Sequence, residues 1–369
     1  MKNNKISLAT IIILSGAYLS FSVGASFGTG QELMQYFGSL GAVGILGLIL
    51  STSLTAVLVF IVSRDCRKKN IVDMNSMFRH YCGKYVGIFL RWYTVVMMFM
   101  FCGVMIAGGA STMNQNYGLD LNIGALIMMV VTVGTAMLGM KKLVTILGNI
   151  APIILAGVLI ICIYNIINPT DGLAAGNAAL LEQGVELRIS DNFVIAGLLQ
   201  FSLVVLMAGS YVASVVTRPN TSDKEMIIGN ISGQLTMMVI QIIMLTAFLV
   251  NGSIVGGTDV PVLMLAGRLG NAFSAVYGII LVLAIYTTVT GMDWIVASNL
   301  VPETNKWYRL VAVLVGVAAY VYSLFGSFTQ LLNLVLTMSS YVGIIFIIGI
   351  VVTKIMDIVK GRNITSAQA

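Results

Sequence analysis

The stretch SVGASFGTGQELMQYFG, residues 22–38, interrupts an apolar segment that otherwise spans 6–37. It places three glycines and one glutamate close together, at Gly24, Gly28, Gly30 and Glu32. Glycine lets the backbone leave helical geometry because it carries no Cβ. In hydrocarbon, non-helical backbone is tolerated only where it is buried in protein or lines a cavity. The stretch therefore predicts a broken membrane helix that contributes to a binding site.

The composition excludes a soluble globule. Hydrophobic residues make up 58% of the 369 residues and charged residues 9%, with a mean hydropathy of +0.97, whereas about 25% charged is typical. Apolar stretches of about 20 residues predict spanning helices, so we expect an all-α integral membrane protein with a single domain, 1–369. Ten helices are expected, at about 6–37, 40–62, 84–112, 121–140, 143–167, 192–217, 227–250, 272–300, 307–325 and 330–355.

The basic residues predict the orientation. The N-terminal stretch resembles a secretory signal, but its apolar run continues without an A-x-A site, so we expect a retained first helix. With a cytoplasmic N-terminus, eighteen of the 20 Lys and Arg residues fall on the inner side, leaving Arg188 and Arg268 outside. The positive-inside rule therefore favours a multi-pass protein of a bacterial cell membrane with both termini cytoplasmic. The net charge of +6 needs no nucleic-acid partner.

The cysteine and histidine content argues against an enzyme. Cys66, Cys82, Cys102 and Cys162 show no C-x-x-C spacing, so free thiols are expected, with neither a disulfide framework nor a zinc site. The single histidine, His80, is expected to be a solvated loop residue. No cofactor and no catalytic residue is predicted.

A weak internal repeat divides the chain. Gly24 corresponds to Gly209, the loop at Asp73 to the loop at Asp259, and the turn at Lys141 to the turn at Gly326, each separated by about 185 residues. Five helices is an odd number, so a second copy must insert upside down, as in the inverted repeats of secondary transporters. We expect repeat one at about 6–167 and repeat two at about 192–355; chance coincidence of common glycines is the alternative.

Glu32 has two interpretations. Thr29 and Glu32 fit the capping box S/T-x-x-E, in which Thr29 accepts from the amide at position 32 and Glu32 reaches back. As an ionisable residue within a span, Glu32 is also a candidate for binding a cationic group or for carrying a proton. The two roles are compatible.

The sixth predicted helix contains Gly209 and Ser210 past its middle. A break there would face the break in the first helix and form a polar cavity. The alternative is that the small residues only allow close helix packing.

The eighth predicted helix carries Thr287 and Thr288 near its centre. With backbone carbonyls of the first helix, at Gly24 and Phe27, the two hydroxyls would form an all-oxygen shell suited to Na⁺. Adjacent hydroxyls often only bond the i−4 carbonyl instead. Asp293, deeper in the same helix, is a candidate for pairing with a basic inner-loop residue or for proton coupling.

The residues GASFGTGQELMQYF, 24–37, resemble the GxGFASGQEIxQFF signature of the YkvI-type bacterial membrane proteins, which are similar to the amino acid–polyamine–organocation superfamily with the LeuT fold. Thr29 and Gly28 depart from the family's usual Ser and Ala. The resemblance implies a 5+5 inverted repeat, with helices 1 and 6 discontinuous at the midplane, and a substrate site between them.

The resemblance also implies roles for individual residues. The amides of Gly28, Thr29 and Gly30 would bind a substrate carboxylate, and the sodium site would join the first helix to Thr287 and Thr288. The segment 259–270 would form an extracellular lid. An ionised Glu32 would compete with a substrate carboxylate for the same helix end, which favours an amine-bearing ligand. The remaining candidate ligands are Phe101 and Tyr211, as rings for cation–π contact, and Gly209 and Ser210.

The leading functional hypothesis is an ion-coupled secondary transporter of a small amine-bearing solute, first of all an amino acid, with Na⁺ or H⁺ as coupling ion. A membrane receptor for small nutrients resembling a germinant-receptor subunit is the alternative, as is a proton-coupled transporter or exporter of another small organic solute. A channel is disfavoured because no charged ring or pore loop is visible. Gln330 and Asn333 are either loop caps or pocket residues. The expected partners are a small-molecule substrate and the lipid bilayer; the sequence does not indicate an oligomeric state.

Overall fold

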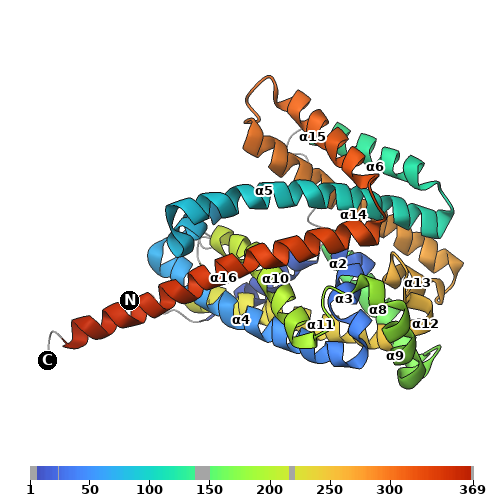
Figure 1. Ribbon diagram of the computed structural model, residues 1–369, viewed down its shortest axis with the longest axis horizontal. Helices are drawn as coiled ribbons and strands as arrows, with labels where there is room; N and C mark the ends of the chain where they lie inside the picture. The colour runs from blue at the N-terminus through green and yellow to red at the C-terminus, as the bar shows by residue number, and fades with distance from the viewer. Residues whose placement is uncertain (1–5, 24, 138–149, 216–220, 367–369) are drawn as a thin grey trace.

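The computed structural model describes residues 6–23, 25–137, 150–215 and 221–366. Within these ranges the chain is helical apart from short connections, and no β-strand occurs. Figure 1 shows the helices packed side by side, with α16 extending well beyond the others toward the C-terminus. The elements are α1 Leu8–Ser22, α2 Ala25–Thr29, α3 Gln31–Tyr36, η1 Gly38–Val43, α4 Gly44–Lys69, α5 Met74–Tyr117, α6 Leu121–Ala136, α8 Ile150–Ile167, α9 Gly172–Gln183, η2 Val185–Leu187, α10 Phe193–Val215, α11 Asp223–Leu249, α12 Gly252–Val255, α13 Pro261–Gly267, α14 Asn271–Leu300, α15 Tyr308–Ser323 and α16 Phe328–Ser366.

Each predicted span corresponds to apolar helix in the described chain. Five helices are each long and apolar enough to cross a membrane, or six if Pro152–Ile167 and Gly172–Gln183, bent by 118°, are taken as one span. Shorter apolar helices account for the other predicted spans: α1, α6, α15 and the apolar part of α10. The first predicted span is divided into α1, α2 and α3, which is why none of its pieces reaches the length of a bilayer core.

The helix packing has a two-fold pattern. The first predicted span, as α1, packs on the seventh, α11, and the sixth span, α10, packs on the second, α4. Likewise α15 packs on α5 and α14 packs on α6, which pairs the ninth span with the third and the eighth with the fourth. An inverted repeat that relates five helices to the next five requires these matched pairs. Residues 24 and 141, two landmarks of the sequence repeat, lie outside the described ranges.

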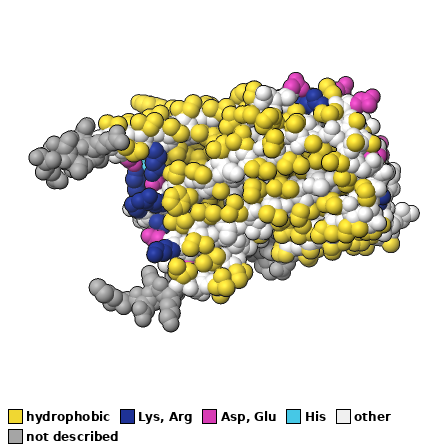
Figure 2. Space-filling view, turned by 90° about the horizontal axis from the view of Figure 1, so that it is seen from below, with side chains coloured by type: hydrophobic (Ala, Val, Ile, Leu, Met, Phe, Trp, Pro, Cys, Tyr) yellow, Lys and Arg dark blue, Asp and Glu magenta, His cyan; other side chains and the backbone are white. Residues whose placement is uncertain are grey.

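The charged residues gather at the ends of the molecule. Figure 2 shows broad apolar surface along its length, with Lys and Arg concentrated at the end near the chain termini. Ion pairs tie the helices together there: Lys354 pairs with Asp65, which is 4% exposed, and Lys69 pairs with Asp357 at 3.3 Å. The apolar belt between polar ends fits a protein that spans a bilayer.

The two arginines expected on the outer side hold the connections between helices. Arg188 donates to the carbonyl of Ser39 at 2.8 Å, and Arg268 donates to the side-chain oxygen of Asn251 at 2.7 Å. Both therefore satisfy oxygen atoms where chain segments turn, at the end that also carries α9, α12 and α13 (Figure 1).

His80 is not the loop residue that the sequence suggested. It lies within α5, and its Nε2 is 3.1 Å from the Nζ of Lys69 on α4. Helix α5 begins at Met74 and bends at Gly83, which has a φ of 74°. The polar segment thus forms a first helical stretch before the membrane span, with Asp73 accepting from the amide of Ser76 as its N-cap.

Candidate functional site

The first predicted span breaks on both sides of a five-residue helix. Helix α1 ends at Ser22, and α2 ends at Thr29. Gly30 then adopts the left-handed conformation, with φ 79° and ψ −2°, before α3 begins at Gln31. Left-handed backbone is accessible to glycine at no steric cost, so Gly30 is the residue that sets the second break. Gly24 lies outside the described residues.

Gly30 is also required by packing. A Cβ at this position would lie 2.7 Å from the Phe248 ring and 2.8 Å from a methyl group of Val262. Val262 belongs to α13, within the segment expected to form a lid, and α13 packs against α2. These two contacts leave no room for a side chain at the turn between α2 and α3.

Gly28 lies within α2, and its carbonyl group accepts a hydrogen bond from another helix. The hydroxyl of Tyr277 on α14 donates to the Gly28 carbonyl at 2.8 Å, and both residues are buried. A Cβ at Gly28 would lie 2.8 Å from Leu281. Gly28 is thus a contact point between the broken helix and α14.

The capping box predicted for Thr29 and Glu32 does not form. Thr29 instead accepts from the amide of Gln31 at 3.3 Å and donates to the carbonyl of Ser26 at 2.8 Å. The N-cap of α3 is Gly30, which has no side chain to accept a hydrogen bond. Because the left-handed turn moves Thr29 away from the amide at position 32, the Glu32 carboxylate is released to another partner.

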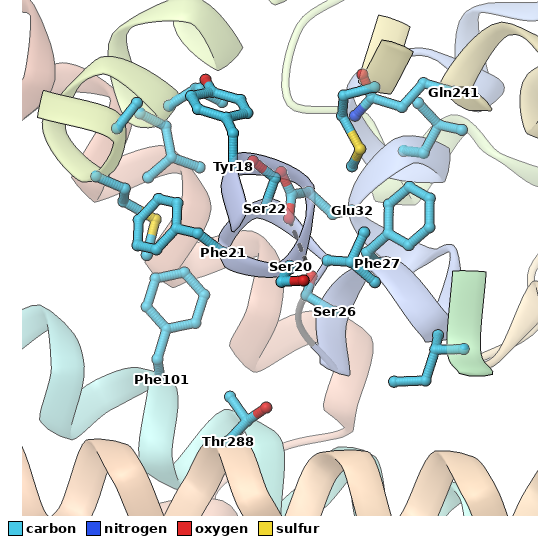
Figure 3. A pocket seen from close by; sticks show the side chains of 18 of the residues that line it. Tyr18, Ser20, Phe21, Ser22, Ser26, Phe27, Glu32, Phe101, Gln241 and Thr288 are labelled. Atoms are coloured by element: carbon cyan, nitrogen blue, oxygen red, sulfur yellow. Dashed lines mark hydrogen bonds between the residues drawn. The ribbon is translucent and has the colours of Figure 1, made fainter. Parts of the chain in front are cut away.

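That partner is Ser26. Its hydroxyl donates to Oε2 of Glu32 at 3.0 Å, across the second break. Figure 3 shows this bond, with Ser22 on the same side as the carboxylate. Glu32 is half-buried and lines a cavity, so one face of its carboxylate is held while the other remains open to a ligand.

The cavity has a volume of about 510 Å³ and is bounded by helices from both predicted repeats. Pockets of about 300 to 1,000 Å³ are typical of small-molecule sites. Helices α1 to α3 supply Tyr18, Ser20, Phe21, Ser22, Val23, Ser26, Phe27, Gly30, Glu32 and Leu33; the other walls come from Thr52, Thr55, Met98, Phe101, Met105, Ile154, Gln200, Leu203, Val204, Met207, Ala208, Gln234, Met237, Gln241, Met244, Ala284, Thr287, Thr288, Gly291, Met292 and Ile295.

Glu32 is the only charged side chain among the described residues that line this cavity. The other polar groups are hydroxyls and amides, several of which are already paired. Tyr18 donates to the side-chain oxygen of Gln234 at 2.8 Å, and Gln200 accepts from Ser51 at 2.5 Å. The cavity therefore carries one negative charge in neutral, largely apolar surroundings.

Aromatic and thioether groups form much of the wall. Phe27 and Phe101, both expected at the site, line the cavity (Figure 3). Tyr211, also expected there, is not among the lining residues. Its ring stacks on that of Phe21, with the ring centroids 4.8 Å apart, and meets the ring of Tyr18 edge-on, with the centroids 5.5 Å apart. From this aromatic group, Tyr18 and Phe21 line the cavity.

The break expected at Gly209 and Ser210 is wrong. Helix α10 is continuous from Phe193 to Val215. A Cβ at Gly209 would lie 2.9 Å from the Met77 side chain, so this glycine permits close packing of α5 on α10, which is the alternative that the sequence left open. Met207 and Ala208, just before it, line the cavity instead.

Thr287 and Thr288 both line the cavity on α14. Each hydroxyl donates to the Ala284 carbonyl, at 2.8 and 2.9 Å. Bonding of the two hydroxyls to the helix backbone was the alternative to a sodium site. Because each hydroxyl acts only as a donor in these bonds, its oxygen lone pairs remain available to bind a cation or to accept a hydrogen bond. Of the expected sodium ligands on the first helix, the Phe27 carbonyl accepts from the Gly30 amide at 3.1 Å; Gly24 is not described.

Asp293 does not line the cavity. It is 1% exposed, and neither of its side-chain oxygens has a hydrogen-bond partner among the described residues. The sequence suggested that Asp293 pairs with an inner-loop Lys or Arg, but no such ion pair occurs among the described residues. Gln330 and Asn333 are also outside the cavity: Gln330 accepts from the Ser327 amide at 3.2 Å, and Asn333 donates to the Leu187 carbonyl at 2.9 Å.

Sequence reasoning missed most of the neutral polar lining. Gln234 and Gln241 are seven residues apart in an apolar helix and therefore share a face, which is a usable signal for a cavity wall. Ser22 and Ser26 flank the break directly. Tyr277, which binds Gly28 across the fold, gave no local signal because 249 residues separate the two.

Four free cysteines are found, as expected, at Cys66, Cys82, Cys102 and Cys162. Within the described ranges, no group of three or more His, Cys, Asp or Glu side chains is arranged to hold a metal ion.

Two curated Bacillus subtilis (strain 168) proteins are homologous to part of the chain. The uncharacterized membrane protein YkvI is 26% identical over 136 residues, which cover 35% of this chain and 36% of YkvI. The uncharacterized protein YyaD is 27% identical over 137 residues, or 37% and 39% of the two chains. The chain thus matches a little over a third of each relative's length. No protein-family model matches it.

Solved transporter structures share the fold. Mhp1, a nucleobase-cation-symport-1 family transporter, has a TM-score of 0.53 at 13% identity, covering 88% of this chain and 74% of its own. The Eremococcus coleocola manganese transporter gives 0.54 at 15%, covering 91% and 76%. A Na⁺-coupled sialic acid symporter gives 0.52 at 13%, covering 94% and 87%. The chain therefore has the LeuT-like fold of a multi-pass membrane protein.

Proposed function

Because the chain has the LeuT-like fold of these solved transporters, we propose that it is an ion-coupled secondary transporter of a small amine-bearing solute. Transport proceeds by alternating access around the cavity at the broken first helix. The chain functions as one transmembrane domain, 1–369, built from two inverted repeats. The ligand sits against Glu32, with Phe101 and Phe27 as flanking rings.

The observation that carries this proposal is the single charge in the cavity. Among the described residues that line the cavity, Glu32 is the only one with a carboxylate, and none is a Lys, Arg or His. An intramembrane carboxylate that has no basic partner is costly unless a cation binds there. A ligand ammonium group supplies that cation and forms a charge-assisted hydrogen bond with the open face of the carboxylate.

The walls suit the rest of an organic amine. Aromatic faces attract cations through the ring quadrupole, and Phe21, Phe27 and Phe101 contribute rings to the cavity. Methionine side chains adapt their shape to apolar ligands because they are unbranched and polarizable. Several line this cavity, namely Met98, Met105, Met207, Met237, Met244 and Met292.

Amino acids remain within the proposed class, but their carboxylate needs a donor. Of the amides expected to serve, that of Gly30 already donates to the Phe27 carbonyl at 3.1 Å. The next amide along the chain, that of Gln31, donates to Thr29 Oγ1 at 3.3 Å. A zwitterion would have to displace these bonds. The proposal therefore ranks amines without a carboxylate beside amino acids, and binding measurements decide between them.

Two coupling ions fit the cavity. Na⁺ would bind at the lone pairs of Thr287 and Thr288 together with carbonyls of Gly24 and Phe27. Protons would bind at Glu32 or Asp293. The proposed location is the bacterial cell membrane with both termini cytoplasmic, since the basic residues gather at the end near the termini (Figure 2).

Thermal unfolding of the purified protein tests the proposal. A ligand that binds only the folded state stabilises it by RT ln(1 + [L]/Kd). We expect a rise in melting temperature with at least one member of a panel of amino acids, primary amines and quaternary ammonium compounds. Each compound is measured in Na⁺ and in K⁺ buffers at two pH values.

The Glu32→Gln variant should lose that rise, because it keeps the shape of the side chain and removes its charge. Glu186→Gln is the matched control, since Glu186 is exposed in η2 and its charge lies outside the cavity. If no amine stabilises the wild-type protein, or if Glu32→Gln responds as fully as Glu186→Gln, the proposed substrate class is wrong.

A further inference from the structure

Helix α14 has two polar faces with different surroundings. At 100° per residue, the cavity-lining positions share one face of the helix, and Asp293 lies on the opposite face. The cavity-lining residues are Ala284, Thr287, Thr288, Gly291, Met292 and Ile295. Asp293 is therefore separated from a ligand at Glu32 by the thickness of α14.

Helix α14 packs against α5, α6 and α15, among other helices. A Cβ at Gly316 of α15 would lie 3.8 Å from Oδ1 of Asp293, and the same position touches Val133 of α6. The carboxyl group thus lies where these two helices meet behind α14. It is 1% exposed, and no described residue bonds to either oxygen.

The neighbouring titratable groups do not supply a donor. Cys102 of α5 and Tyr308 of α15 interact electrostatically with Asp293, but Cys102 points its thiol at the Val289 carbonyl, 3.9 Å away. Tyr308 donates to the Ala136 carbonyl at 3.4 Å. Helix α6, Leu121–Ala136, contains no titratable residue, and none of the ion pairs among the described residues includes Asp293.

We propose that Asp293 is a proton-binding site on the rear face of α14, and that its proton is exchanged when α14 moves relative to α6 and α15. The inference rests on the proposed transport function and places the coupling proton away from the ligand. In the packed arrangement the neutral carboxyl group is favoured, because the side chain is buried without a donor among the described residues and burial of an unpaired ion is costly. Separation of the helices would admit water and allow ionisation.

Linkage makes this coupling reciprocal. If packing of α14 favours the protonated carboxyl, protonation favours packing by the same free energy. Loss of the proton therefore shifts the transporter toward the state in which the rear of α14 is hydrated. Glu32 stays free to bind the amine throughout, since the two carboxylates serve different ligands.

Infrared spectroscopy of the reconstituted, ligand-free protein tests the site directly. A protonated carboxyl group has a carbonyl stretch that ionised carboxylates lack and that shifts in heavy water. At neutral pH we expect this band in the wild-type protein and in Glu32→Gln. It should weaken in Asp293→Asn, where only the ligand-free Glu32 carboxyl group contributes, and disappear when both substitutions are combined. The band in Glu32→Gln should be the same in Na⁺ and K⁺ buffers.

Three results would overturn the proposal: a band that Asp293→Asn leaves unchanged, the absence of the band in Glu32→Gln, or a band that Na⁺ abolishes. The last would indicate a sodium site. The Glu32→Gln spectrum keeps the test decisive even if Asp293→Asn fails to fold. No substrate is needed, so failure here leaves the amine proposal standing.

The pH dependence of unfolding tests the coupling to packing. If the folded state binds this proton more readily than the unfolded state, stability must fall as pH rises. The wild-type melting temperature should therefore decline toward alkaline pH, and Asp293→Asn should flatten that decline. An unchanged slope in Asp293→Asn would contradict the coupling.

Discussion

The hydroxyl of Ser26 donates to Oε2 of Glu32 at 3.0 Å, from one side of the left-handed turn at Gly30 to the other. This bond holds Glu32, the one charged side chain among the described residues that line the cavity, at the break in the first helix. It also explains the residue types around the break: a glycine that turns the chain, a short hydroxyl that reaches across it, and a carboxylate that remains half open.

Removing the Ser26 hydroxyl should weaken amine binding without abolishing it. The bond orients the Glu32 carboxylate before the amine binds, so Ser26→Ala should raise the Kd. A hydrogen bond to a charged group contributes about 1.5–3 kcal/mol, which limits that increase to roughly a hundredfold. Calorimetric titration with the best amine of the panel measures this change. Ser327→Ala, a change in the turn before α16, is the control; equal affinities for the two variants would contradict the role of Ser26.

Gly30→Ala should destabilise the fold. A left-handed alanine costs about 1–2 kcal/mol, and its Cβ would meet Phe248 and Val262 at 2.7 and 2.8 Å. We expect a clear fall in the melting temperature. Gly16→Ala is the matched control, since Gly16 is helical with open space around it; it should be neutral or slightly stabilising. Equal melting temperatures would refute the strained turn.

Tyr277→Phe should loosen the contact between the broken helix and α14. The variant leaves the buried Gly28 carbonyl without the donor that lies 2.8 Å away. An unsatisfied buried group costs about 1–3 kcal/mol, and the change should appear as a lower melting temperature. Tyr341→Phe should have little effect because Tyr341 is 58% exposed. A Tyr277→Phe protein as stable as the control would count against this link.

The sodium hypothesis makes a prediction about Thr287 and Thr288. If their lone pairs bind Na⁺, the wild-type protein should melt at a higher temperature in Na⁺ than in K⁺ buffer, and the double substitution to alanine should remove the difference. The measurement needs no substrate. A Na⁺ effect that survives in the double variant would place the ion elsewhere.

Two ion pairs at the basic end should differ in strength. Asp65 is 4% exposed and accepts from Tyr81 at 2.7 Å as well as pairing with Lys354. Removing one partner of a buried pair costs about 3–5 kcal/mol, so Lys354→Met should lower stability strongly. Lys69→Met breaks an exposed pair, which is worth about 0–1 kcal/mol. Similar unfolding midpoints for the two variants would contradict the ranking.

Local pattern was enough to predict much of the fold. Apolar runs of membrane length located the helices, and the glycines before Glu32 located the break, because backbone conformation and hydrophobicity act over neighbouring residues. Glu32, Phe27, Phe101, Thr287 and Thr288 were predicted at the site, and all five line the cavity.

Contacts between distant helices decided what the sequence left ambiguous. Gly209 was expected to break a helix and instead packs against Met77, a choice that depends on a neighbour far away in the chain. Asp293 was expected to pair with a basic inner-loop residue or to serve in proton coupling, whereas the fold buries it away from the cavity with no hydrogen-bond partner among the described residues. The Glu32 carboxylate was expected to bind back to Thr29 but accepts from the Ser26 hydroxyl instead, because Gly30 is left-handed.

The most direct test of the account is an electrical measurement on proteoliposomes adsorbed to a solid-supported membrane. Sudden addition of an amine that stabilises the purified protein should produce a transient current, because a cation enters the lipid-embedded site and moves with a coupling ion. The account predicts a current in the wild-type protein and none in Glu32→Gln, while Glu186→Gln behaves as wild type. Binding without any current, or a current that persists in Glu32→Gln, would contradict transport through this site.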